Sequence, residues 1–290
     1  MIIDTHSHLN FKAYKNDLDE VVGRTLQDNI WMINVGTKYE TSKQAVELAE
    51  KYNEGVYSAI GLHPIYAGAE FQKIKTDPEE GEFLVKEENF EKEKYKELAF
   101  GRSPTGEAKS KKVVAIGEIG LDYYYRPKSK TKLEQFKEKQ KQVFIEQLDF
   151  AKELDLPVII HCRMAHEDLI KILKTKNIKG VIHCFTGNLE QAQQYTDMGF
   201  YLGMNGIIFK FDIDEVIKKV PLDKILVETD CPYLTPLPAV ASAEAGPEDY
   251  VRNEPIFIKY VIQKIADLKN ISFDEVAEKT TQNARNLFKI

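Results

Sequence analysis

The chain begins MIIDTHSHLN, and this stretch carries three potential metal ligands at alternating positions, Asp4, His6 and His8. They follow an apolar pair, Ile2 and Ile3, as at the start of a β-strand. Side chains alternate between the two faces of a strand, so a carboxylate and two imidazoles at a spacing of two point the same way. The stretch alone is compatible with a metal site or with a polar strand end.

Histidines and acidic residues recur where other apolar runs end. The chain has six histidines, and five of them, including His63, His161 and His183, fall at or just beyond the carboxyl end of a predicted strand. Glu118 ends VVAIGE, and Asp230 ends ILVETD. Imidazoles and carboxylates suit first-row divalent metals, and such a cluster is costly to bury without a cation or partners. Without His63, four histidines and these two carboxylates provide six donors, more than one tetrahedral zinc needs, so two adjacent cations bridged by a carboxylate are expected.

The remaining histidines and the cysteines receive other interpretations. His63, in GLHP, is expected either to support a ligand, to contact substrate or to have a structural role, with Pro64 fixing the turn. His166 lies in a predicted helix and is interpreted as a surface residue. The three cysteines follow no CxxC pattern, which argues against disulfides and a thiolate zinc cluster and favours small buried residues.

Eight short apolar runs alternate with segments of helical periodicity, and these elements must position the polar side chains. The runs are Ile2 to Thr5, Trp31 to Val35, Val56 to Gly61, Val113 to Glu118, Pro157 to His161, Gly180 to His183, Phe200 to Gly203 and Ile225 to Thr229. The stretch TKLEQFKEKQKQVFIEQLDFAKELD has an apolar helical stripe and predicts a helix that covers the sheet. Near the end of the chain, Ser272 and Glu275 form a capping-box pattern that predicts a final helix.

Eight strands, each followed by helical material, predict a (β/α)8 TIM barrel as a single domain over residues 1–290. The alternative is a doubly wound open sheet, but no GxGxxG motif follows the first strand. In a barrel the carboxyl ends of all strands meet at one mouth, so side chains distant in sequence converge there. The region 67–112 is enlarged and irregular, and its run KEENFEKEKYKEL predicts a solvated helix flanked by loops.

The amino-acid composition limits the classes of protein to which the chain can belong. With 43% hydrophobic and 30% charged residues, the chain is expected to be a soluble globular protein with a sizeable core. No signal peptide or membrane span is apparent, so a cytoplasmic location is expected, with no membrane association and no obligate protein partner. The formal net charge is −6. A polyanionic partner must therefore be held by a local basic patch or by bound cations.

The ordered motifs resemble those of the TatD family of metal-dependent hydrolases over nearly the whole chain. The matching stretches are DTHSHL, GLHP, GEIGLDYY, IHCR, HCFTG, TDCPYLTP, RNEP and QNARNLF. The family is a group of TIM-barrel metallohydrolases that includes deoxyribonucleases, often acting as exonucleases. The resemblance implies two divalent cations per chain, Mg, Mn or Zn, and a ligand set of His6, His8, Glu118, His161, His183 and Asp230.

The resemblance also implies roles for individual residues. Glu118 would bridge the cations, with His6 and His8 on one and the other two histidine ligands mainly on the second. Asp230 would bind metal and orient or deprotonate the attacking water, so Asp230 and Glu118 are the expected catalytic residues. Asp4 would support the ligand histidines. The expected substrate contacts are His63, Arg163, Tyr233 and Arg252.

The leading hypothesis is a deoxyribonuclease of exonuclease type, which cleaves phosphodiester bonds with a metal-activated water and acts on single-stranded DNA or DNA ends. Bases could stack on aromatic residues at the mouth, although each could instead pack in the core: Tyr123, Tyr124, Tyr125, Phe185, Phe209 and Tyr233. One alternative is an enzyme with the same metal centre that hydrolyses an amide or ester bond, such as an amidohydrolase or an aminoacyl-tRNA deacylase. Another is a metal-stabilised interaction protein, which is least favoured because structural zinc sites are usually closed and cysteine-rich. The loop 238–250 carries small and acidic residues where the family often has a basic stretch, which weakens the case for phosphate binding there.

Overall fold

Eight parallel strands form one sheet in their chain order, from β1 to β8. They are seen in a computed structural model that describes residues 1–69, 85–100, 112–236 and 251–290. The strands are β1 (Ile2–Ser7), β2 (Ile30–Val35), β3 (Val56–Ile60), β4 (Val113–Asp122), β5 (Val158–Arg163), β6 (Gly180–Ile182), β7 (Tyr201–Met204) and β8 (Ile225–Val227). Each overlaps one of the eight predicted runs, with ends that differ by up to four residues. All ten residues of β4 are buried, as expected of a parallel strand covered on both faces.

The first and last strands of the sheet meet. Ser7 at the end of β1 forms a parallel bridge with Cys231, just beyond β8. The amide of Asp230 donates to the carbonyl of His6 at 2.8 Å, and the amide of His8 donates to the carbonyl of Cys231 at 2.9 Å. These contacts make the sheet a nearly closed barrel, which confirms the predicted (β/α)8 fold over an open doubly wound sheet.

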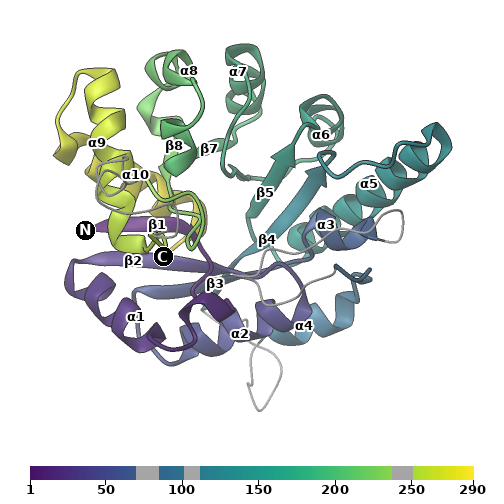
Figure 1. The fold of residues 1–290 in the computed structure, drawn as a ribbon, viewed down its shortest axis with the longest axis horizontal. Coiled ribbons are helices and arrows are strands. Elements are labelled where there is room, and N and C mark those ends of the chain that lie inside the picture. Colours follow the sequence, from purple (N-terminus) through teal and green to yellow (C-terminus); the bar gives the residue numbers. More distant parts are fainter. Residues whose placement is uncertain (70–84, 101–111, 237–250) are drawn as a thin grey trace.

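Helices surround the barrel, as Figure 1 shows. They are α1 (Leu18–Gln27), α2 (Tyr39–Glu50), α3 (Pro64–Ala67), α4 (Lys92–Phe100), α5 (Lys130–Glu153), α6 (His166–Leu173), α7 (Leu189–Asp197), α8 (Asp214–Lys219), α9 (Ile258–Lys269) and α10 (Phe273–Phe288). Short 3-10 helices are η1 (Lys12–Tyr14), η3 (Gly206–Phe209), η4 (Leu222–Lys224) and η5 (Pro255–Phe257). Within the described ranges, no helix has the length and apolar character needed to cross a membrane.

The two helices predicted from local patterns are present. In α5 the buried side chains include Phe136, Phe144 and Leu148 from the predicted apolar stripe. At the start of α10, Ser272 Oγ accepts from the amide of Glu275 at 3.1 Å, and Glu275 Oε2 accepts from the amide of Ser272 at 3.0 Å. This reciprocal pair is the predicted capping box.

Part of the irregular region also follows the sequence prediction. Within it, α4 buries Tyr95 and Ala99 and leaves most of its charged side chains exposed, so the predicted solvated helix is confirmed there. Segments 70–84 and 101–111, together with the acidic loop 238–250, lie outside the described residues.

Candidate metal centre

The six predicted ligands meet at the carboxyl end of the barrel strands. Three lie within β1, β4 and β5, two directly follow β1 and β6, and one lies three residues after β8, namely His6, Glu118, His161, His8, His183 and Asp230. Parallel strands in a barrel bring these ends to one mouth, which explains why residues so distant in sequence are neighbours.

Glu118 lies at the centre of the cluster. Its Oε2 atom lies 3.6 Å from His6 Nε2 and 3.9 Å from His8 Nε2. Its Oε1 atom lies 2.8 Å from His161 Nδ1 and 3.1 Å from His183 Nε2. Two pairs of imidazoles therefore face different oxygens of one carboxylate, a geometry that suits a ligand shared by two cations.

Asp230 joins the side of the cluster formed by β1. Its Oδ1 atom lies 3.4 Å from His8 Nε2 and 3.7 Å from His6 Nε2. The side chain of Asp230 is 14% exposed, against 5% for Glu118. Asp230 is thus the more accessible of the two carboxylates from the mouth.

The donor atoms fit divalent cations. His6 Nε2 and His8 Nε2 lie only 3.0 Å apart, so two imidazole nitrogens converge on one point. His6 Nδ1 is buried and has no hydrogen-bond partner among the described residues. Three sets of residues have ligand atoms within 4.8 Å of one another: His6, His8 and Glu118; His63, Glu118 and His161; and His6, His183 and Glu228. Imidazole and carboxylate donors of this kind suit zinc, manganese and related metals.

The electrostatics keep both predicted carboxylate ligands ionised. Burial opposes the charge of Glu118, but the nearby imidazoles of His63 and His183 outweigh it and hold its pKa well below the usual value. Burial also opposes the charge of Asp230, and the hydrogen bond with His8 and the surrounding imidazoles lower its pKa. Ionised carboxylates are the form that binds metal.

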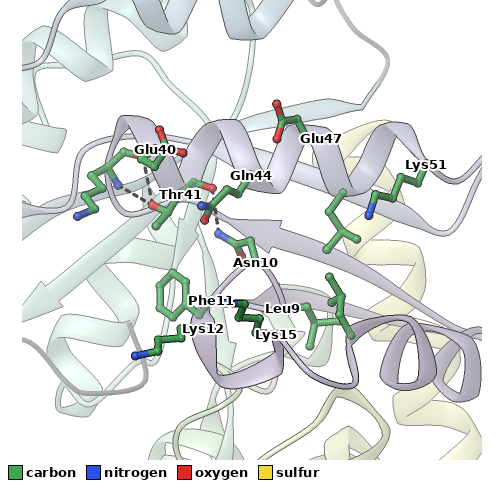
Figure 2. Close-up of a pocket in the computed structure, with 13 residues that line it drawn as sticks. Leu9, Asn10, Phe11, Lys12, Lys15, Glu40, Thr41, Gln44, Glu47 and Lys51 are labelled. Carbon is green, nitrogen blue, oxygen red and sulfur yellow. Dashed lines mark hydrogen bonds between the residues drawn. The ribbon is translucent and has the colours of Figure 1, made fainter. Parts of the chain in front are cut away.

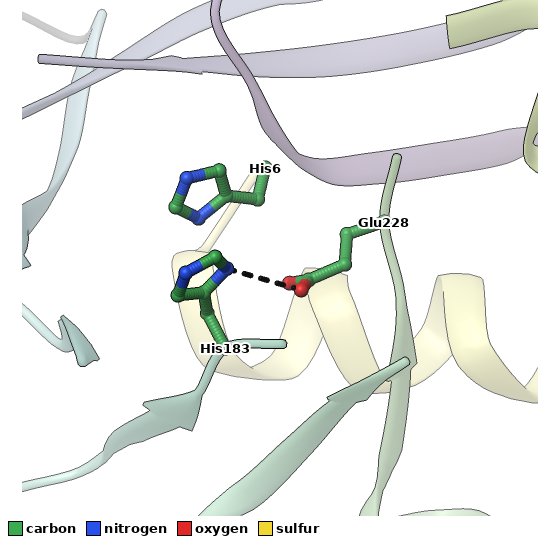
Figure 3. Close-up of side chains that lie close together, drawn as sticks. All are labelled: His6, His183 and Glu228. Atoms are coloured by element: carbon green, nitrogen blue, oxygen red, sulfur yellow. Dashed lines mark hydrogen bonds and ion pairs between the residues drawn. The ribbon is translucent and has the colours of Figure 1, made fainter. Parts of the chain in front are cut away.

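Acidic residues behind the ligands orient two of the imidazoles. Glu228 Oε1 lies 3.2 Å from His183 Nδ1 and accepts from the amide of Cys184 at 2.7 Å. Figure 3 shows Glu228 beside His183, and the ring of His6 stacks on that of His183 at 3.9 Å between centroids. Asp122 Oδ2 lies 3.2 Å from His161 Nε2.

The sequence analysis missed both of these acidic residues, although each stands close to a predicted ligand in sequence. Glu228 precedes Asp230 by two residues, and Asp122 follows Glu118 by four. Each could have been found as a second acidic residue close in sequence to a strand end that already carries a predicted ligand.

Asp4 acts through the backbone rather than through an imidazole ring. Its Oδ1 atom accepts from the amides of His6, at 3.2 Å, and Thr229, at 2.9 Å. Its Oδ2 atom accepts from the Thr229 hydroxyl at 2.6 Å. Burial raises the pKa of Asp4 to about 8. Asp4 thus fixes the end of β1, which carries His6, against the segment after β8, which carries Asp230.

His63 lies in the cluster, where it contacts both Glu118 and the backbone of α3. Its Nε2 atom lies 3.4 Å from Glu118 Oε1, and its Nδ1 atom accepts from the amide of Ile65 at 3.0 Å, which caps α3. Both a structural contact and a position facing the candidate metal centre are therefore observed.

His166 is not a surface residue, so that interpretation was wrong. The side chain is half-buried at the start of α6, and Nδ1 lies 3.0 Å from the Tyr195 hydroxyl and 3.3 Å from Cys162 Sγ. Burial lowers the pKa of His166 to about 4. The helix begins at this residue and turns it toward α7, which a single position in a periodic pattern could not indicate.

A cavity of about 610 Å³ opens over the cluster. Its lining includes the metal-centre residues and a set of aromatic and apolar side chains, among them Phe11, Tyr124, Tyr125, Met164, Phe211 and Tyr233. Arg163 also lines it, with its guanidinium carbon 3.6 Å from the centroid of the Tyr124 ring. A polar floor with an aromatic rim can hold a substrate that combines charge with flat apolar groups.

The predicted substrate contacts and stacking residues divide into two groups. Arg163, Tyr233, Tyr124 and Tyr125 line the cavity, as does His63. Tyr123 and Phe185 are buried in the core, and Phe209 is exposed but does not line this cavity.

Arg252 lies outside the cavity lining and has other partners. Its guanidinium donates to both carboxylate oxygens of Asp17, at 2.9 and 2.5 Å, and to Glu254 Oε1 at 3.0 Å. It also donates to the carbonyl of Ala13 at 2.7 Å. These contacts join the segment before η5 to the start of α1.

Comparisons with known proteins agree with this architecture. A family model described as TatD related DNase matches residues 3–289. The uncharacterised metal-dependent hydrolase YabD of Bacillus subtilis is 39% identical over 297 residues, covering 100% of each chain. The human deoxyribonuclease TATDN3 is 32% identical over 290 residues, covering 99% of this chain and 94% of its own. The crystal structure of YjjV, a TatD homolog from Escherichia coli, superposes with a TM-score of 0.77 at 29% identity, covering 100% of this chain and 98% of that one.

Proposed function

The chain belongs to the TatD related DNase family of metal-dependent hydrolases, and from this premise we propose that it is a deoxyribonuclease that removes nucleotides from the ends of single-stranded DNA. The observation that carries the proposal is the divided contact of Glu118, whose two oxygens face separate pairs of imidazoles. Two-metal sites are typical of nucleases and phosphatases. The name of the human relative, deoxyribonuclease TATDN3, supports the same reading.

The proposed centre holds two divalent cations, with magnesium, manganese and zinc as candidates. His6, His8 and Asp230 would hold the first, and His161 and His183 the second, with Glu118 shared between them. When bound, such cations acidify water toward neutral pH and offset the negative charge of a phosphodiester. Because the chain has a net charge of −6, bound cations would supply the local positive charge that attracts a phosphodiester to the site.

The residues of the chain then have distinct tasks. Asp230 is ionised and partly exposed at the mouth, so it is the carboxylate that orients the attacking water and accepts its proton. Glu118 is less exposed than Asp230 and acts by holding the two halves of the centre together. Glu228 and Asp122 keep His183 and His161 in their orientations.

The rim of the cavity supports a single strand as substrate. Tyr124 is 51% exposed, and Met164 and Phe211 are 59% and 57% exposed, which is unusual for large apolar side chains. Unpaired bases can stack on such groups, whereas the bases of a duplex are already stacked on one another. Arg163, stacked on Tyr124, adds a cation beside this platform.

One set of assays compares the hydrolysis of phosphodiester, amide and ester bonds with each of three metals. Metal-stripped protein is refilled with magnesium, manganese or zinc and given end-labelled single- and double-stranded oligonucleotides beside amide and aminoacyl-ester substrates. We expect stepwise shortening of the single strand with at least one metal, and loss of that activity in Asp230→Ala. The proposal fails if DNA stays intact with every metal while an amide or ester is hydrolysed and Asp230→Ala abolishes that reaction. The single domain, the cytoplasmic location and the absence of an obligate partner stay predictions.

A further inference from the structure

A second cavity, of about 600 Å³, lies between α2 and the segment that follows β1, and we call it the α2 groove (Figure 2). One wall is a single face of α2, formed at helical spacing by Thr41, Gln44, Leu48 and the adjoining Lys51. The opposite wall comes from the segment 9–18, which includes η1. No motif of the sequence analysis predicted this groove.

The α2 groove carries a local excess of positive charge. Four lysines line it, Lys12, Lys15, Lys38 and Lys51, against two acidic residues, and of these lysines Lys38 is buried and lies 4.0 Å from Glu88, outside the lining. Lys12, Lys15 and Lys51 are exposed, and the described residues offer them no side-chain ion pair or hydrogen bond.

The acidic residues compensate this charge only in part. Of the two, Glu47 lies 3.9 Å from Lys43 on its own helix, and Figure 2 shows its carboxylate pointing away from the opposite wall. On a chain of net charge −6, such a concentration of lysines calls for an anionic ligand.

The floor of the α2 groove is apolar, and Asn10 lies beside it. Leu9 and Leu48 are buried there, and Leu18 is half-buried. Asn10 donates from Nδ2 to the carbonyl of Thr41 at 3.0 Å, while its buried Oδ1 atom has no partner within the described part of the chain. This acceptor is enclosed by the chain, so a ligand in the groove meets the apolar floor and the lysines. Nucleotide bases have flat apolar faces, and their phosphates match the lysines.

The α2 groove is adjacent to the cavity over the metal centre. Phe11 lines both cavities, and its ring stacks on that of His8 with centroids 4.4 Å apart. The carbonyl of Val35 is shared, since it lies 2.8 Å from His8 Nδ1 and 3.4 Å from Asn10 Nδ2. A strand whose end lies beside Asp230 would therefore reach the groove by crossing over Phe11, the residue that the two cavities share.

We propose that the α2 groove binds the part of a DNA single strand that lies behind the nucleotide being removed, with Lys12, Lys15 and Lys51 contacting its phosphates. This inference rests on the proposed nuclease function. An acidic peptide would also meet the lysines, but the position next to a site suited to phosphodiesters favours DNA.

The test replaces the three exposed lysines together, as Lys12→Gln, Lys15→Gln and Lys51→Gln. A matched control carries Lys218→Gln, Lys219→Gln and Lys279→Gln, three exposed lysines of α8 and α10. Binding of a fluorescent single-stranded oligonucleotide is measured at several salt concentrations, with Asp230→Asn added to each protein to prevent cleavage. Hydrolysis of a dinucleotide and of a long single strand is measured with Asp230 intact.

We expect the salt dependence of binding to weaken only in the groove variant. Because each phosphate contact with a single strand contributes about −0.7 to the slope of log K against log salt, the loss of three contacts changes the slope by about 2. Over a fourfold rise in salt, the wild-type chain should therefore lose about 16-fold more affinity than the groove variant. Hydrolysis of the dinucleotide, which is too short to enter the groove, should be unchanged.

Three results would overturn the inference. If the groove variant and the control bind the long strand with equal affinity and slope, while the wild type cleaves it, the groove does not bind DNA and the nuclease proposal stands. The groove also does not bind DNA, and the nuclease proposal still stands, if the groove variant loses binding of an acidic peptide but not of DNA. If the wild type cleaves neither the dinucleotide nor the long strand with any metal, the proposed function fails and the inference fails with it.

Discussion

At the scale of single residues, Glu118 holds the site together. Its Oε1 and Oε2 atoms face imidazoles from different strands, and no other carboxylate among the described residues lies between both pairs. We expect Glu118→Gln to lower cation binding and to reduce hydrolysis at least about 100-fold, because an amide nitrogen cannot bind a cation. Metal content after dialysis and the rate of oligonucleotide cleavage measure the two effects. Glu278→Gln, an exposed change on α10, is the control and should alter neither.

Glu228 offers a second test at this scale, because it contacts a predicted ligand without facing the mouth. Its Oε1 atom also receives a hydrogen bond from Asn205 Nδ2 at 3.2 Å, so the carboxylate is held in place beside His183. We expect Glu228→Gln to weaken cation binding about 10- to 100-fold while the chain stays folded. Titration with a divalent metal measures the affinity. An affinity equal to that of the wild type would show that Glu228 does not tune His183.

His166 gives a pH dependence that is separate from the metal centre. Its pKa is about 4 in the folded chain, below the usual 6.5. Above pH 6.5 the imidazole is neutral in both states. As the pH falls from 6.5 toward 4, the unfolded chain takes up a proton that the folded chain does not, so stability falls by at most about 1.4 kcal/mol per pH unit.

The variant His166→Asn isolates this effect, because it removes the titrating group and keeps a polar atom near Tyr195. We expect the free energy of unfolding of the wild type to fall more steeply than that of the variant between pH 6.5 and pH 5. Urea unfolding at several pH values provides the measurement. Parallel curves would mean that the imidazole is not held neutral by burial.

At the scale of elements, the strands could be predicted because parallel strands are buried on both faces and appear as short apolar runs. The carboxyl end of β4, however, could not be predicted from the sequence. The predicted run stops at Glu118, whereas the strand continues to Asp122, since its pairing with β5 resumes after a register shift between Ile116 and Ile119. That continuation brings Asp122 beside His161, a contact that no local pattern contains.

The segment after β8 gives a further prediction at this scale. Arg252 was expected to contact substrate, but its hydrogen bonds join this segment to Asp17 and Ala13 near α1. We expect Arg252→Ala to lower the free energy of unfolding by about 1–2 kcal/mol, since the ion pairs are partly exposed, and to leave KM for DNA unchanged. Chemical unfolding and steady-state kinetics separate the two roles. A raised KM with unchanged stability would restore the substrate contact.

At the scale of the whole molecule, the barrel topology made much of the candidate site predictable. Once the eight runs were taken as a barrel, the positions of His6, Glu118, His161 and Asp230 at strand ends implied that they meet. The α2 groove was not predictable in this way. Its lysines come from η1 and from both ends of α2, and only the packing of these two elements brings them to one surface.

The central claim is that two cations held by this cluster make the chain a hydrolase of single-stranded DNA. The most direct test titrates metal-stripped protein with manganese while the release of nucleotides from an end-labelled single strand is followed, and bound metal per chain is measured in parallel. The account predicts that release develops only as the second cation binds. Full activity with one cation per chain, or intact DNA with two cations bound, would contradict it.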